Sequence, residues 1–240
     1  EEVALTMTNY RVDTLELGTF TTESGETINN LKLRYEHVGY KGQPLVVVCH
    51  ALTGNHLTYG TDEKHGWWRE IIDGGYIPRH DYQFLTFNVI GSPFGSSSKL
   101  NDPNFPQHLT LRDIVKAIEK GIKALDFDKI NILIGASLGG MQAMELLYNN
   151  QFQIDKAIIL AATGKTSSYS RAFNEIARQA IHLGGKEGLS IARQLGFLTY
   201  RSSKSYDQRF TPDEVVTYQQ YQGNKFKKNF DLQCYLTLLD

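Results

Sequence analysis

The surroundings of Ser137 predict chemistry more clearly than those of any other residue in the chain. Ser137 is the centre of the pentapeptide Gly135-Ala136-Ser137-Leu138-Gly139. Residues 130–134 before it are apolar and rich in β-branched side chains, which predicts a buried strand, and the residues after Gly139 follow helical spacing. A strand, a G-x-S-x-G turn and a helix in this order are typical of a nucleophile elbow, which presents one serine hydroxyl at the edge of a sheet.

A serine that attacks a carbonyl carbon needs hydrogen-bond donors for the negative charge that forms on the carbonyl oxygen. The backbone N–H of Leu138, at the start of the predicted helix, is one such donor. The second is expected from Leu52, in the small and polar loop 51–56 that follows the apolar run 44–50. We therefore predict an oxyanion hole made by the backbone N–H groups of Leu138 and Leu52.

The serine hydroxyl also needs a base, and in chains with this elbow the order is Ser, then Asp or Glu, then His. Only His182 follows Ser137, and it falls in a predicted helix, where a surface or packing role is expected. His50 is interpreted as a hydrogen-bonded orienter of the loop after it, in preference to a general base. Cys49, inside a predicted strand, is the less favoured alternative nucleophile. The sequence thus predicts a nucleophile and an oxyanion hole without a convincing acid–base pair.

The other histidines lie in predicted strands or loops and have no partner that the sequence identifies: His37, His56, His65, His80 and His108. No group of His, Cys, Asp and Glu has the spacing of metal ligands, so no metal is predicted.

Strands and helices alternate over the first two thirds of the chain. Strands are predicted at 14–20 and 31–40, joined as an edge hairpin through Ser24-Gly25, and at 44–50, 83–90, 130–134 and 155–162. A short helix is predicted after Gly66, and a helix with a capping-type start at Thr110 is predicted to run to about Leu125. Residues 91–106 form a long loop, a type of segment that is usually functional or mobile.

The alternation stops after residue 162. Four consecutive helices are predicted at 170–183, 188–200, 212–222 and 231–240. A helical block without strands breaks the rhythm of a parallel α/β sheet and is most simply a lid inserted after the sixth strand. We predict two domains, an α/β core over 1–165 and a helical lid over 166–240.

Composition narrows the class of protein. The 240 residues carry 25 basic and 26 acidic side chains, scattered along the chain, so neither nucleic acid nor a membrane surface is an expected partner. The two cysteines, Cys49 and Cys234, are too few for a disulfide framework, which favours a reducing compartment and a cytoplasmic location. No apolar run is long enough to cross a bilayer. Met7 is interpreted as the native start, with residues 1–6 of other origin.

An ordered series of motifs resembles the homoserine O-acyltransferases, of the homoserine O-acetyltransferase type, in the α/β-hydrolase superfamily. The matching segments span nearly the whole chain: 48–54, 66–68, 88–91 with 95–96, 105–106, 109–115, 135–143, 188–193, 218–226, 230–231 and 235–236. The resemblance implies an α/β-hydrolase fold with a mainly parallel sheet. It also implies that Ser137 takes an acyl group, most simply acetyl, from acyl-CoA and passes it to the hydroxyl of L-homoserine, in methionine biosynthesis.

The resemblance implies further site residues and partners. Arg193 matches the family arginine that holds the substrate carboxylate, and Thr53 lies in a matching segment and is a second candidate for substrate binding. Acyl-CoA is expected as a co-substrate, no permanently bound cofactor is expected, and a homodimer is expected. The triad Asp and His of the family lie after the lid, so the chain is expected to stop before the last strands. The connection 182–187 is shorter than the usual family loop.

Two other interpretations stay open at this point. One is a serine esterase or a serine O-acyltransferase of the same fold. The other is a catalytically incomplete hydrolase fold that serves as a binding module.

Overall fold

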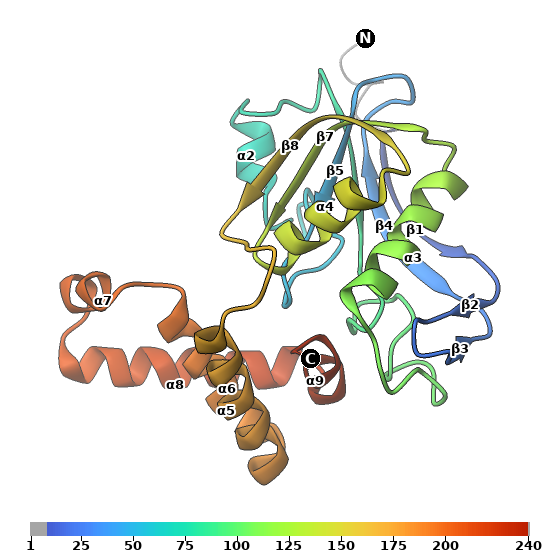
Figure 1. The fold of residues 1–240 in the computed structure, drawn as a ribbon. Coiled ribbons are helices and arrows are strands. Elements are labelled where there is room, and N and C mark those ends of the chain that lie inside the picture. Colours follow the sequence, from blue (N-terminus) through green and yellow to red (C-terminus); the bar gives the residue numbers. More distant parts are fainter. Residues whose placement is uncertain (1–8, 240) are drawn as a thin grey trace. The chain divides into compact units, whose positions relative to one another are not determined.

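The structure is a computed structural model and describes residues 9–239 of the chain. The predicted origin of residues 1–6, the start at Met7 and the last residue of the final predicted helix lie outside the described residues. The chain divides into two compact units, of which the first runs to Gly164 and the second is Lys165–Leu239. Figure 1 shows the elements of each unit. In the part of the chain that the structure describes, no helix is long and apolar enough to span a membrane.

The first unit contains a six-stranded sheet in the order β1-β4-β6-β5-β7-β8. Its strands are β1 (Tyr10–Glu16), β4 (Lys32–Val38), β5 (Leu45–Cys49), β6 (Gln83–Phe87), β7 (Lys129–Ala136) and β8 (Gln153–Leu160). The neighbours β6, β5, β7 and β8 are parallel, whereas β1 and β4 add an antiparallel edge. All five residues of β5 are buried, as expected of an interior parallel strand.

The two faces of the sheet are covered by different helices. Register places Leu33, Phe87 and Val47 on one face, and α3 (Leu111–Ala124) packs there closely enough that a Cβ on Gly121 would lie 2.7 Å from Leu33 and Phe87. The opposite face carries the apolar cluster of Val46, Val48 and Ile134 with Ile72 of α2 (Arg69–Asp73). In Figure 1, α3 and α4 (Leu138–Asn149) lie on the same side of the sheet. The α/β class predicted from the sequence is confirmed.

The start of α3 shows how sequence sets a boundary. The Thr110 side chain accepts a hydrogen bond from Asp113 N–H, and the Asp113 carboxylate accepts from Thr110 N–H, which completes a capping box. The helix therefore begins where the sequence predicts.

The predicted edge hairpin is confirmed, but the bounds of its first strand differ. β1 pairs antiparallel with β4 at the edge of the sheet, and β2 (Phe20–Thr21) and β3 (Thr27–Ile28) continue the same register on either side of Ser24-Gly25. β1 runs from Tyr10 to Glu16, and the strand is interrupted near Gly18, whose φ is +70°.

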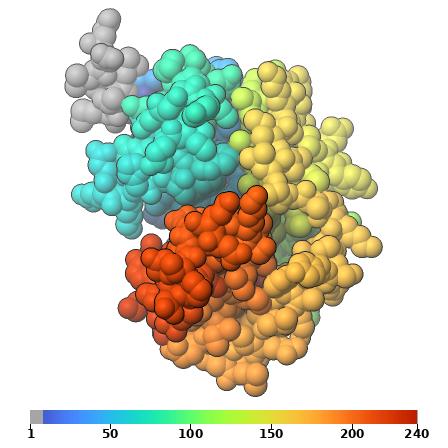
Figure 2. All heavy atoms as spheres, turned by 90° about the vertical axis from the view of Figure 1, so that its left-hand side faces the viewer, coloured from blue at the N-terminus to red at the C-terminus, as the bar shows by residue number. Residues whose placement is uncertain are grey.

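The second unit consists of helices. They are α5 (Ser168–Gly184), α6 (Lys186–Thr199), α7 (Ser203–Arg209), α8 (Pro212–Asn229) and α9 (Leu232–Leu239). Figure 2 shows the atoms of these helices, coloured orange to red. The sequence prediction missed α7 and ended α8 seven residues early, at Gln222. Gly223 does not break α8, because it lies against α6, where a Cβ would fall 2.3 Å from Ser190 Oγ.

Candidate active site

Ser137 lies at the turn between β7 and α4, where its backbone adopts φ +56° and ψ −123°. This conformation is costly for a residue with a side chain. Hydrogen bonds on both sides hold it: Ser137 N–H donates to Leu160 O at 3.0 Å, and Ser137 O accepts from Met141 N–H at 3.1 Å. The side chain is exposed, and none of the described residues hydrogen-bonds its hydroxyl. The turn therefore presents the Ser137 hydroxyl at the edge of the sheet.

The glycines of the pentapeptide permit a close approach of helix and strands. A Cβ on Gly135 would lie 2.1 Å from the carbonyl oxygen of Gly139, and a Cβ on Gly139 would lie 2.1 Å from the carbonyl oxygen of Cys49. Real Cβ atoms do not approach backbone this closely, so no larger residue fits without a shift of the backbone. The first turn of α4 is thus in contact with the end of β5.

Contact between α4 and β5 places the two proposed donors at the same edge of the sheet. Leu138 is the first residue of α4, and the N–H of that position has no partner inside the helix. Leu52 follows the end of β5 by three residues, in a turn closed by Gly54 N–H to Ala51 O at 2.9 Å. Because Cys49 pairs with Gly135 in the parallel ladder, the loop after β5 and the start of α4 emerge side by side. The oxyanion role of these two N–H groups remains a prediction.

His50 connects the loops that leave β5 and β6. It is completely buried, its Nδ1 lies 2.7 Å from Ala51 O, and its Nε2 lies 3.0 Å from Val89 N. A backbone N–H can only donate, so Nε2 accepts and the proton is on Nδ1, which donates to Ala51 O. Burial lowers the pKa of His50 from 6.5 to about 4. The imidazole is therefore a neutral structural group, in agreement with the orienter interpretation.

A second set of hydrogen-bonded polar residues, which the sequence analysis did not predict, lies near His50 and consists of Arg34, His56 and Ser96. Arg34 Nε donates to His56 Nε2 at 3.3 Å, and the loop residue Ser96 accepts from Arg34 N–H at 2.9 Å and donates to Asn88 O at 2.5 Å. Burial, followed by the charge of Arg34, lowers the pKa of His56 to about 4. The long loop 91–106 is thus held to the sheet by buried serines. Its composition of serine and glycine gave no signal of this packing.

The structure gives the surroundings of three other residues that the sequence analysis considered: Cys49, His37 and His182. Cys49 is buried, and desolvation raises the pKa of its thiol to about 12, so the thiolate needed for nucleophilic attack is not available. His37 lies against Gln83 Oε1 at 2.8 Å, on β4. His182 is exposed on α5, as expected for a surface residue.

Arg193 lies in the helical unit, on α6, among aromatic rings. The centre of its guanidinium is 4.8 Å from the centre of the Phe197 ring and 4.7 Å from that of Phe226, and Nη1 donates to the Tyr200 hydroxyl at 3.3 Å. Such stacking fixes the plane of a guanidinium. Thr53 is half-buried in the loop after β5, in the first unit. Thr53 directly follows Leu52 in that loop. The substrate-binding roles of Thr53 and Arg193 remain predictions.

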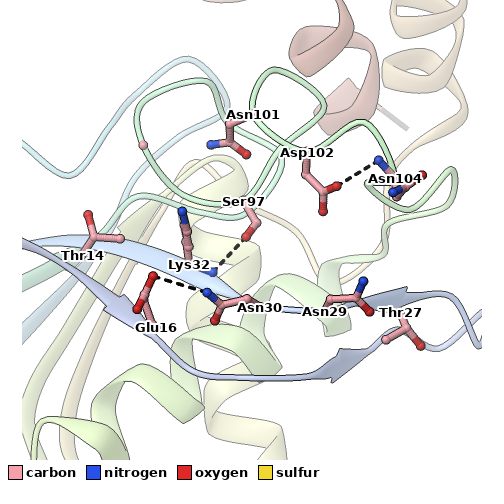
Figure 3. A pocket seen from close by; sticks show the side chains of 11 residues that line it. Thr14, Glu16, Thr27, Asn29, Asn30, Lys32, Ser97, Asn101, Asp102 and Asn104 are labelled. Atoms are coloured by element: carbon pink, nitrogen blue, oxygen red, sulfur yellow. Dashed lines mark hydrogen bonds between the residues drawn. The ribbon is translucent and has the colours of Figure 1, made fainter.

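A separate cavity lies at the antiparallel edge of the first unit. Figure 3 shows its polar lining, and its volume is about 580 Å³. Its wall includes Glu16, Asn30 and Lys32 from the β1 and β4 side, and Ser97 and Asp102 from the loop 91–106. None of the residues predicted to act in the reaction lines this cavity. In the described residues no group of three or more His, Cys, Asp or Glu could hold a metal ion.

The mainly parallel sheet and the serine turn define an α/β-hydrolase fold. A family model described as alpha/beta hydrolase fold matches residues 44–183. A solved structure of homoserine O-acetyltransferase from Staphylococcus aureus is 85% identical, with a TM-score of 0.94, and the match covers 96% of this chain and 71% of that one.

Curated relatives extend the match. Homoserine O-succinyltransferase from Hahella chejuensis is 32% identical over 91% of this chain and 68% of its own length. Homoserine O-acetyltransferase from Methanobrevibacter ruminantium is 33% identical over 89% of this chain, which spans 52% of that relative. The chain belongs to the homoserine O-acyltransferase family of the α/β-hydrolase fold.

Proposed function

We propose that this protein transfers an acetyl group from acetyl-CoA to the side-chain hydroxyl of L-homoserine through an acyl-Ser137 intermediate. The observation that carries the proposal is the exposed serine turn in a chain 85% identical to a homoserine O-acetyltransferase. Relatives at 32% and 33% identity are named for succinyl and acetyl transfer. At about 30% identity the names of the relatives do not distinguish a succinyl-CoA donor from an acetyl-CoA donor. The structure that is 85% identical is named for acetyl transfer, and it favours acetyl-CoA.

The proposed reaction has two half-reactions. Ser137 Oγ attacks the thioester carbonyl carbon while its proton passes to a general base, and the N–H groups of Leu138 and Leu52 stabilise the oxyanion. The C–S bond then breaks, and the thiol of coenzyme A leaves with a proton. The homoserine hydroxyl attacks the acyl carbon of the acyl-serine and gives up its proton to the base. The bond between that carbon and Ser137 Oγ then breaks, and the base returns the proton to Ser137 Oγ as the O-acyl product leaves.

Transfer must exceed hydrolysis of the acyl-serine. We propose that the helical unit Lys165–Leu239 acts as a lid that lowers access of water, and that Arg193 binds the homoserine carboxylate through its planar fork of N–H donors. Thr53, in the loop after β5, is proposed as a second substrate contact.

The remaining parts of the proposal concern location and assembly. Both cysteines are buried, and two cysteines are too few for a disulfide framework, which fits a reducing compartment such as the cytoplasm.

Large apolar side chains are exposed on the helical unit, among them Leu183 at 90% and Tyr221 at 59%, and we propose that part of this surface forms a homodimer. Light scattering of the full-length protein would report a dimer mass if this is correct and a monomer mass if it is not.

The test of the activity uses the full-length protein with acetyl-CoA or succinyl-CoA and three acceptors: L-homoserine, L-serine and water alone. We expect thiol release that depends on acetyl-CoA and L-homoserine, with O-acetylhomoserine as the product. Ser137→Ala is the matched control and should abolish product formation. Thiol release that does not rise when homoserine is added would instead identify a hydrolase, and transfer to L-serine alone would reassign the acceptor.

A further inference from the structure

The orientation of the Ala51–Leu52 peptide decides whether the Leu52 N–H can serve as an oxyanion donor. A peptide group is planar and trans, so the oxygen of Ala51 and the N–H of Leu52 point in opposite directions. Any group that holds the Ala51 oxygen therefore sets the direction of the Leu52 N–H.

Two hydrogen bonds hold the Ala51 oxygen. One comes from His50 Nδ1 at 2.7 Å and the other from Gly54 N–H at 2.9 Å. The Gly54 bond closes a local turn between residues three apart in the chain. The His50 bond, by contrast, comes from a side chain without any exposed surface.

The His50 ring is itself fixed from a different segment. Its Nε2 accepts from Val89 N–H at 3.0 Å, two residues after the end of β6, so the ring cannot rotate without breaking this bond. The ring thus connects a peptide of the proposed oxyanion hole to the backbone of the neighbouring strand end.

The same residue is also tied to the helix that carries the other donor. Gln142 of α4 donates from Nε2 to the carbonyl oxygen of His50 at 3.1 Å, and Leu138 is the first residue of that helix. Three segments are therefore hydrogen-bonded to His50: the loop after β5, the loop after β6, and α4.

We infer that His50 is a positioning residue that aims the Leu52 N–H at the reacting carbonyl oxygen, through its Nδ1 bond to Ala51 O. The inference rests on the proposed function of Ser137 as the nucleophile. His50 does not exchange protons with the substrate in this role.

Two substitutions of His50 test the hydrogen bonds of its two ring nitrogens one at a time. In His50→Asn, the side-chain amide nitrogen can take the place of Nδ1 and donate to Ala51 O, whereas the bond from Val89 is lost. In His50→Gln, the amide oxygen can take the place of Nε2 and accept from Val89 N–H, whereas the bond to Ala51 O is lost. His37→Gln, on β4 and outside these loops, is the control for removal of a histidine that contacts another side chain.

The readout is kcat and KM for acylation of the full-length protein by p-nitrophenyl acetate, next to the free energy of unfolding of each variant. We expect His50→Gln to lower kcat by about a hundred- to a thousandfold with little change in KM, as for the loss of an oxyanion donor. His50→Asn and His37→Gln should keep kcat within about tenfold of the wild type. Equal losses in both His50 variants, or a loss confined to His50→Asn, would overturn the positioning role.

A measurement on the wild type covers the case in which a variant does not fold. Nitrogen-15 chemical shifts of the His50 ring in the full-length protein should show a neutral ring with its proton on Nδ1, and a proton on Nε2 would overturn the inference. Failure of the homoserine assay would not affect these experiments, because p-nitrophenyl acetate acylation and the ring shifts do not require homoserine.

Discussion

Gly139, in the first turn of α4, lies so close to Cys49 at the end of β5 that a Cβ on Gly139 would be 2.1 Å from the Cys49 carbonyl oxygen. Both partners of this contact are backbone groups. Relief of a collision there requires the helix to move away from the strand, and the start of α4 carries the proposed donor Leu138.

Gly139→Ala should therefore lower both stability and activity. We expect a loss of roughly 1–3 kcal/mol in the free energy of unfolding, as for other overpacked sites, and a larger fractional loss of acyl transfer than the unfolded fraction explains. Gly164→Ala is the matched control, since a Cβ there would meet nothing within 4 Å. Urea unfolding and steady-state kinetics of both variants test the prediction, which fails if the two variants behave alike.

The strained backbone of Ser137 predicts that replacement of this residue by glycine stabilises the fold and abolishes activity. Its φ of +56° suits glycine better than any residue with a side chain. Ser137→Gly and Ser137→Ala both remove the hydroxyl, but only glycine relieves the backbone. The relief of about 1–3 kcal/mol exceeds the entropic cost of about 0.4–1 kcal/mol that glycine adds in the unfolded chain. Both variants should be inactive, and Ser137→Gly should unfold at the higher urea concentration. The reverse order would show that the turn is not strained in solution.

Buried neutral histidines predict a loss of stability in mild acid. The pKa of His50 and that of His56 are lowered by burial from 6.5 to about 4, so between these pH values the unfolded chain binds protons that the folded chain does not. The free energy of unfolding should therefore fall as the pH decreases from about 6.5 to about 4, by up to about 1.4 kcal/mol per pH unit for each group.

His56→Gln tests the pH dependence without the loss of the hydrogen bond from Arg34 Nε, because the glutamine oxygen can accept it. Urea unfolding between pH 4 and pH 7 should show a shallower slope for His56→Gln than for the wild type. Parallel slopes would mean that His56 is not the titrating group.

Arg193 predicts a specific change in homoserine affinity. Arg193→Lys keeps the positive charge but loses the planar fork of N–H donors. We expect KM for L-homoserine to rise about tenfold or more and KM for acetyl-CoA to stay unchanged. Arg201→Lys, just beyond the end of α6, is the control. An equal rise of both Michaelis constants in Arg193→Lys would point to a general disturbance of the helical unit instead.

The sequence predicted the features that depend on local pattern. Residues 130–148 contain a strand, a turn and a helix in one short segment, and the observed β7, Ser137 turn and α4 agree with it. The capping residues Thr110 and Asp113 also identified the start of α3. In both cases the pattern that identifies the element lies in neighbouring residues.

Features that depend on distant contacts were missed. Gly223 resembles a helix breaker until its contact with Ser190 on α6 is known, and the polar Ser202–Ser205 segment gave no apolar periodicity for α7. The layer of Arg34, His56 and Ser96 joins segments far apart in the chain, so no local pattern could reveal it. The hydrogen bond of His50 to the loop after it was predicted from its place next to that loop, but its bond from Val89 N–H was not.

The most direct test of the central claim is the mass of the peptide that contains Ser137. The full-length protein is mixed with acetyl-CoA in the absence of an acceptor, quenched in acid, digested and examined by mass spectrometry. We predict a mass increase of one acetyl group on Ser137, lost when L-homoserine is added before the quench. Formation of O-acetylhomoserine without any acetylated Ser137, or in undiminished yield by Ser137→Ala, would contradict the proposed mechanism.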